Sequence, residues 1–124
     1  MPHQKTLTNG SAIARTNLTL TTPIAGAATA VAVAAFDTNG YSKITGSIRS
    51  NKDCTVKVYQ GIGTDAVPLY DYLTSVAVTA GTTEGAGAAW EIAIIANSAR
   101  IDITNSAGAD LTTLSFQGYL RSLT

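Results

Sequence analysis

The sequence predicts an all-β protein, an antiparallel β-sandwich of jelly-roll-like form with about eight strands and an extended N-terminal arm. Apolar and polar side chains alternate at period two in several stretches, and turn signals separate these stretches at short spacing. No segment shows the 3.6-residue period of an amphipathic helix. The 124 residues suffice for one domain with a real core. Because several strands are short, two sheets are favoured over a closed barrel.

The arm is predicted at residues 1–22 and the sandwich at 23–124. Met1–Thr16 is polar and has no strand or helix period, and Asn17–Thr22 is expected to form a short strand. Two outcomes stay open for the arm. It is either a disordered terminus or a segment that orders by adding to a neighbouring subunit. In the second case its contact residues are expected to be Leu7, Ile13, Arg15 and Leu18.

The first sandwich strands are predicted at Thr29–Phe36, Tyr41–Arg49 and Cys54–Tyr59. In the first of these, Val31 and Val33 are expected on one face. Asn39–Gly40 lies between the first two strands and predicts a hairpin, because both residues tolerate positive φ.

A strand piece at Val67–Leu73 contains Pro68, which favours an edge or an irregular crossing. A separate strand is predicted at Ser75–Thr79, and a long loop follows it over Ala80–Ala88.

The clearest alternation is in the last three strands, predicted at Ala89–Ala96, Ala99–Thr104 and Leu111–Arg121. Trp90 shares its phase with Ile92 and Ile94, which predicts a core tryptophan.

Charge is scarce in this chain. Charged residues make up 13% and the formal net charge is zero, so a large part of the surface can lose water at modest cost. This composition favours extensive protein contact, with a sparsely charged monomer as the alternative. No basic stripe supports nucleic-acid binding.

Neither a disulfide nor a membrane span is expected. Cys54 is the single cysteine, and its phase places it among apolar residues. No stretch reaches the about 20 apolar residues that cross a bilayer. Ile24–Phe36 begins late and lacks a basic start, so a cleaved signal is not expected. The protein is therefore expected to be made in a cytoplasm.

We expect no enzyme, no cofactor and no metal site. His3 is the single histidine, which removes histidine-based triads and multi-histidine metal sites. A carboxylate-pair hydrolase stays open as an alternative, because such enzymes need only two suitably placed acids. Asp102 is expected to form a surface ion pair with Arg100, and Glu91 to face solvent. The acids considered for such a pair are Asp65, Asp71, Glu84, Glu91 and Asp102.

Exposed aromatics suggest either a glycan platform or an interface. The candidates are Tyr59, Tyr70, Tyr72 and Tyr119, since tyrosine is common at interfaces and also stacks on sugars. Arg100 and Arg121 are expected on the polar side of the last strands, as interface anchors or as solvated charges that discourage edge pairing.

Four stretches together resemble a known family: Tyr41–Ser50 (YSKITGSIRS), Thr55–Tyr59 (TVKVY), Ala99–Ala107 (ARIDITNSA) and Leu114–Leu120 (LSFQGYL). They are similar to small β-sandwich virion proteins of tailed phages, including head decoration (cement) proteins.

The resemblance implies a structural protein on the capsid surface of a virion. Its implied partner is the major capsid protein, and its implied state is a homo-oligomer, with a trimer favoured. Such a protein clamps neighbouring capsid subunits and needs no active site. A carbohydrate- or receptor-binding module of a phage tail or fibre is the alternative.

Overall fold

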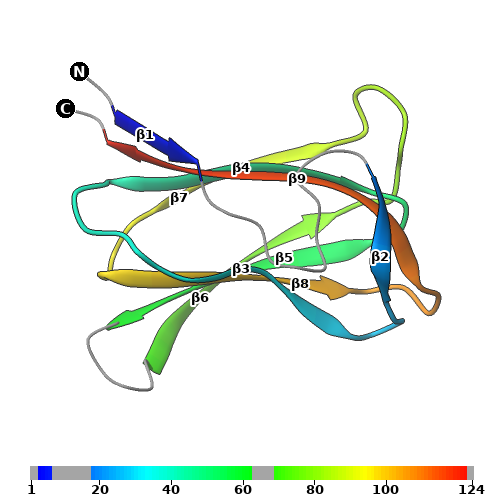
Figure 1. Cartoon of the computed structure of the whole chain (residues 1–124), viewed down its shortest axis with the longest axis horizontal. Helices are drawn as coiled ribbons and strands as arrows, with labels where there is room; N and C mark the ends of the chain where they lie inside the picture. The colour runs from blue at the N-terminus through cyan, green and yellow to red at the C-terminus, as the bar shows by residue number, and fades with distance from the viewer. Residues whose placement is uncertain (1–2, 7–17, 63–68, 123–124) are drawn as a thin grey trace.

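The computed structural model describes residues 3–6, 18–62 and 69–122. These residues form two antiparallel sheets packed face to face, so the predicted all-β antiparallel sandwich is confirmed (Figure 1). The strands are β1 (His3–Thr6), β2 (Leu18–Ile24), β3 (Thr29–Asp37), β4 (Lys43–Ser50), β5 (Cys54–Ile62), β6 (Leu69–Val78), β7 (Ala88–Ala93), β8 (Ser98–Asn105) and β9 (Leu111–Ser122).

Sheet A has the order β1-β9-β4-β7, with β2 also paired to β9, and sheet B has the order β3-β8-β5-β6. Four antiparallel pairs are nested along the chain: β2 with β9, β3 with β8, β4 with β7, and β5 with β6. Rolling this long double ribbon adds the β4–β9 and β5–β8 pairs and produces two sheets. That arrangement is a jelly roll.

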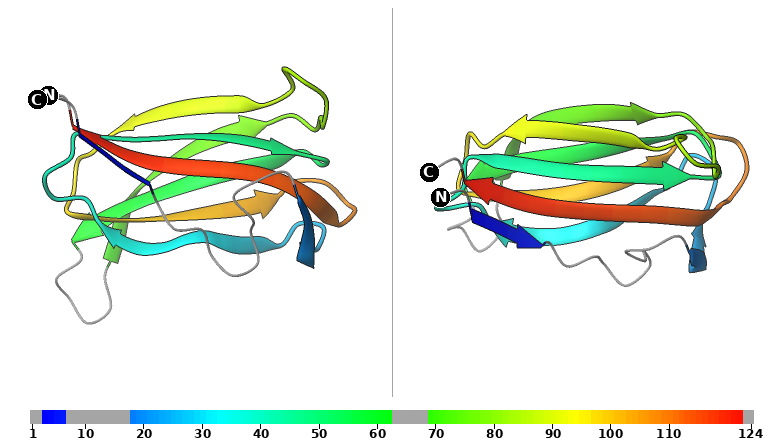
Figure 2. Two further views of the ribbon diagram at one scale, coloured as in Figure 1. Left: turned by 45° about the horizontal axis from the view of Figure 1, so that its top comes forward. Right: turned by 90° about the horizontal axis from the view of Figure 1, so that it is seen from above.

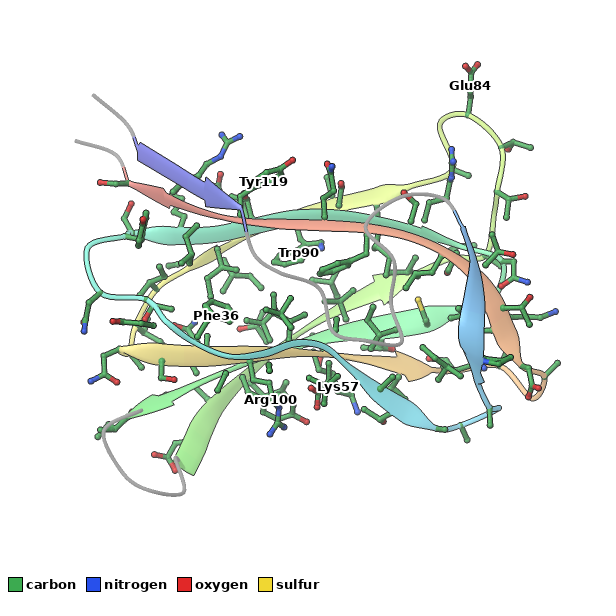
Figure 3. The ribbon with its side chains drawn as sticks, in the orientation of Figure 1. Phe36, Lys57, Glu84, Trp90, Arg100 and Tyr119 are labelled. Atoms are coloured by element: carbon green, nitrogen blue, oxygen red, sulfur yellow. The ribbon has the colours of Figure 1, made fainter. Side chains whose placement is uncertain are left out.

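The core lies between the sheets, as Figure 3 shows for Trp90 and Phe36. It is formed by the alternating residues of both inner faces, and its largest fully buried side chain is Phe116. Trp90 is 8% exposed and Cys54 is 2% exposed, which confirms both as core residues.

The hairpin predicted at Asn39–Gly40 is wrong. Gly40 has φ +87 and the Tyr41 N–H donates to the Thr38 carbonyl, so the residues do form a tight turn. However, β3 belongs to sheet B and β4 to sheet A. The turn therefore carries the chain across the sandwich, and local turn chemistry does not reveal whether the flanking strands pair.

The shared face predicted for Val31 and Val33 is also wrong. The register of β3 against β8 shifts between these residues. A shift of this kind changes the face to which later side chains point. Ala32 and Val33 are buried, whereas Val31 is 45% exposed on the outer face.

One strand replaces the two pieces predicted around Thr74. β6 runs without a break from Leu69 to Val78 and pairs only with β5 among the described strands, which makes it an edge strand. Pro68 lies outside the described residues.

The N-terminal strands both border β9. β1 pairs with Tyr119–Ser122, and β2 pairs with Leu111–Leu114. Most of the predicted arm, including Leu7, Ile13 and Arg15, lies outside the described residues. The start of β1 and the end of β9 lie side by side at one end of the sandwich (Figure 2).

Candidate docking surface

The outer face of sheet B carries a row of large side chains across three strands. Val56 and Val58 of β5 are buried, so period two directs Tyr59 outward. Tyr59 pairs with Arg100 of β8 on one side and with Leu73 of β6 on the other. Directly opposite residues of an antiparallel pair share a face. Arg100, Tyr59 and Leu73 therefore form one continuous row.

Contacts with Asp102 and Tyr59 help to hold Arg100 in place. Its Nε and Nη2 donate to Asp102 Oδ1 and Oδ2 at 3.1 and 3.2 Å, a bidentate pair two residues apart on β8. Its guanidinium carbon also lies 4.7 Å from the centre of the Tyr59 ring. Guanidinium groups stack favourably on aromatic faces. The expected Arg100–Asp102 ion pair is confirmed, although the Asp102 side chain is only 8% exposed.

A second row lies beside the first. Lys57 of β5 pairs with Asp102 and with Ser75, and Asp102 in turn pairs with Val31 of the edge strand β3. Figure 3 shows Lys57 and Arg100 pointing away from the core below the lower sheet. Leu73 is 51% exposed and Val31 is 45% exposed. We call these two rows the Arg100 surface: Val31, Lys57, Tyr59, Leu73, Arg100 and Asp102.

This composition suits protein contact. An arginine fixed by a carboxylate and an aromatic ring loses little side-chain entropy on binding. Arg and Tyr are the residues that most often dominate interface energetics. The neighbouring outer positions are small and uncharged, among them Thr55, Thr104 and Ala77, so little further charge must be desolvated.

The outer face of sheet A is different. Tyr119 and Arg121 border a shallow hollow of about 450 Å³, and the Tyr119 hydroxyl donates to Gln117 at 2.9 Å. Glu91, on the same hollow, is paired with Lys43 at 2.5 Å. Figure 3 shows Tyr119 above the upper sheet, on the side opposite Arg100.

The structure therefore divides the predicted interface residues. Tyr59 and Arg100 come together, whereas Tyr119 and Arg121 lie on the other sheet. Tyr72 is 54% exposed on the edge strand, in the phase opposite Leu73. The side chains of Leu18 and Tyr70 lie outside the described residues, as do Leu7, Ile13 and Arg15.

A glycan platform built jointly from Tyr59 and Tyr119 is not present, because Tyr59 belongs to sheet B and Tyr119 to sheet A. In addition, Arg100 lies over the Tyr59 ring, so a sugar would have to displace it from that face.

The acids do not converge either. Glu91 lies on sheet A, Asp71 and Asp102 lie on sheet B, and Glu84 lies in the loop between β6 and β7 (Figure 3). Asp65 is outside the described residues. Within residues 3–6, 18–62 and 69–122, no group of three His, Cys, Asp or Glu side chains could hold a metal ion. No helix of the same residues is long and apolar enough to cross a bilayer.

Of the six residues of the Arg100 surface, only Tyr59 and Arg100 are among the predicted interface residues, and strand phase could not show that Val31 and Leu73 are exposed. Val31 is exposed only because β3 changes register, and Leu73 is exposed because β6 is one edge strand. Neither feature has a signal in the period-two pattern.

No protein-family model matches the chain, and no curated protein matches it. Solved structures do share the fold. A chain of Bacillus endospore appendages, described as a family of disulfide-linked pili, has a TM-score of 0.52 and 15% identity over 98% of this chain and 86% of that chain. A chain of infectious bursal disease virus, Gx strain, has a TM-score of 0.55 and 19% identity over 97% of this chain and 32% of that chain. This chain thus spans about a third of the viral one. At these identities the likeness shows the fold.

Proposed function

We propose that this chain is a structural protein that binds in many copies to a larger protein shell, as a phage head decoration protein does. The Arg100 surface is the observation that carries the proposal. It offers a preorganised arginine, a tyrosine and two half-exposed aliphatic side chains on a sheet with few other charges. These groups bury well against protein and create no reactive centre.

Two further observations support an assembly role. The net charge is zero, so neighbouring copies do not repel one another strongly. Two structures that share the fold come from a pilus and from a virus. The stretches within 41–121 resemble decoration proteins, and this resemblance specifies the proposed partner as a major capsid protein and the proposed location as the capsid surface.

The energetics suit a repeated contact. One docking surface of six residues gives modest affinity, because the loss of translational, rotational and side-chain freedom offsets most of the free energy gained by burying apolar surface. A copy that bridges two shell subunits gains through effective concentration. Stabilisation of the shell then arises from the number of copies and needs no single tight site.

Co-sedimentation with capsids tests the proposal. The purified protein is mixed with capsids assembled from the major capsid protein encoded with it, and the bound fraction is measured after centrifugation. We expect saturable binding that weakens about tenfold or more in Arg100→Ala, a typical loss for an interface arginine. Arg121→Ala, an arginine on sheet A, is the matched control and should bind normally.

Two results would contradict the proposal. One is the absence of binding at all protein concentrations, and the other is equal loss in Arg100→Ala and Arg121→Ala. Binding to a glycan array that Tyr59→Ala abolishes would instead favour the carbohydrate-binding alternative.

A further inference from the structure

The edge strand β6 exposes an unusual stretch of sheet. Residues Asp71–Ser75 are all exposed, so both faces of the strand are open along this stretch. Tyr72 is 54% exposed on one face and Leu73 is 51% exposed on the other. Among the described strands β6 pairs only with β5. Figure 1 shows this part of the β5–β6 ribbon extending from the body of the sandwich at the lower left.

From Tyr72 to Val78 this edge lacks the devices that prevent sheet extension. Proteins protect edges with bulges, prolines, lysines or very short strands. The opposite edge of sheet B, β3, has two register shifts. In β6 the register shifts once, between Leu69 and Tyr72 at the start of the strand, and is regular from Tyr72 to Val78. The strand is ten residues long, and Asp71 is its single charged residue. An unprotected apolar edge of this kind favours pairing with another strand.

We propose that β6 pairs antiparallel with β6 of a second copy of this chain, about a two-fold axis at Leu73. Sheet B then continues from one copy into the next. A two-fold contact is self-complementary, so the same residues supply both sides. The proposal does not depend on capsid binding.

The register centred on Leu73 places apolar side chains of the two copies opposite each other. Leu73 lies opposite the second copy's Leu73 on the outer face, which buries both half-exposed side chains. Tyr72 lies opposite the second copy's Thr74 on the other face. The row Arg100, Tyr59, Leu73 of one copy therefore continues as Leu73, Tyr59, Arg100 of the second copy.

The same register also pairs unused charges. Counted from the axis, Asp71 lies opposite the second copy's Ser75, beside the register shift between Leu69 and Tyr72. Ser75 is the direct neighbour of Lys57 on β5. Two strand spacings, about 10 Å, separate the backbones of Lys57 and the second copy's Asp71. Lysine and aspartate side chains extended toward each other can close this distance. Among the described residues, neither Lys57 nor Asp71 has an ion-pair partner within its own chain.

The mass of the protein in solution, measured by light scattering without capsids, tests the pairing. From low micromolar to hundreds of micromolar concentrations, we expect a monomer–dimer equilibrium. Leu73→Lys places two cations at the axis and should raise the dimer dissociation constant about a hundredfold. Val31→Lys is the matched control, since it makes the same change on the outer face of sheet B at the opposite edge, and it should leave the constant unchanged.

Two more variants test the register. Asp71→Lys should weaken the dimer by placing two lysines together, and Lys57→Asp combined with Asp71→Lys should restore it. Leu73→Cys should form a disulfide-linked dimer on mild oxidation, because the two thiols meet at the axis. The wild-type chain is the control, since Cys54 is buried.

The pairing would be overturned by a single-chain mass at every concentration, by a trimer, or by a dimer that Leu73→Lys leaves intact. It would also be overturned if Leu73→Cys did not cross-link. Because these measurements contain no capsid, they can fail while capsid binding succeeds, and the reverse.

Discussion

Replacing Gly46 by alanine tests how the core of sheet A is packed. Gly46 of β4 pairs directly with Trp90 of β7 on one side and with Gly118 of β9 on the other. A Cβ atom at Gly46 would lie 2.1 Å from Trp90 Cζ2 and 2.6 Å from Cε2. The indole ring therefore occupies the space that a side chain at Gly46 would need.

The structure sets the size of the effect. Carbon atoms in contact stay about 3.5 Å apart, so the ring must move by about 1.4 Å. Trp90 is only 8% exposed and its centroid lies 6.5 Å from that of Phe116, so its movement disturbs a packed core. Overpacking of this kind costs about 1–3 kcal/mol, and a lost aromatic pair about 1 more. The lower entropy of alanine in the unfolded chain offsets about 0.5 kcal/mol.

We therefore expect Gly46→Ala to lower the free energy of unfolding by about 3 kcal/mol, measured by guanidinium titration with circular dichroism. In a Trp90→Leu background the ring is absent and the same change should cost less than about 1 kcal/mol, which makes the coupling about 2 kcal/mol. Gly108→Ala is the control, because nothing lies within 4 Å of its added Cβ. Equal costs of Gly46→Ala with tryptophan and with leucine at position 90 would refute this explanation.

Three other predictions concern buried groups. Burial raises the pKa of the Cys54 thiol above its usual 9.0. The thiol therefore loses its proton at lower pH in the unfolded chain than in the folded one, so the free energy of unfolding should fall as pH rises above about 9. A Cys54→Ala variant with the same pH profile as the wild type would disprove this. Asn105→Ala removes hydrogen bonds to the Ile24 and Ala109 carbonyls and from the Ala107 N–H. It should lower the free energy of unfolding by about 3 kcal/mol, measured by thermal unfolding. Asn39→Ala, at an exposed position, is the control and should change it very little. Asp102→Ala should lower the free energy of unfolding by about 1–2 kcal/mol, because the Asp102 carboxylate is largely buried. Glu91→Ala should lower it by less than about 1 kcal/mol, because the Glu91 side chain is 55% exposed. Denaturant titrations that gave the reverse order would contradict this explanation.

Most strands and most inner-face positions were predictable, because period two depends on local chemistry alone. Trp90, Phe116 and the valines of β5 are buried as their alternation indicates. The glycine at position 46 fits the same phase, but the sequence does not explain it. The Trp90 ring of another strand fills the space that a side chain there would need, and this contact depends on tertiary structure.

Features set by long-range pairing were not predictable. The Asn39–Gly40 turn has the right residues for a hairpin, yet its flanking strands enter different sheets. The period-two pattern gives no sign that Gln60 is a buried, bonded side chain. In the structure its side chain donates to the Ala93 carbonyl at 3.0 Å and accepts from the Ile95 N–H at 2.9 Å. A buried polar side chain is tolerable only with such partners, and these partners lie more than thirty residues away along the chain.

The Arg100 surface was only half predictable for the same reason. Tyr59 and Arg100 follow from strand phase, and their stacking follows from the β5–β8 register. Leu73 joins them only because β6 lies at the edge beside β5. This position gives Leu73 a neighbour in its own chain on one side and an open edge on the other. If two copies meet at that edge, their Arg100 surfaces become one surface of twice the length on a single extended sheet. A shell subunit that met it would bind both copies together, so loss of self-association by Asp71→Lys, at a residue outside the Arg100 surface, should also weaken capsid binding through avidity. Capsid binding that stays at full strength in a strictly monomeric Asp71→Lys variant would show that the two contacts are energetically separate.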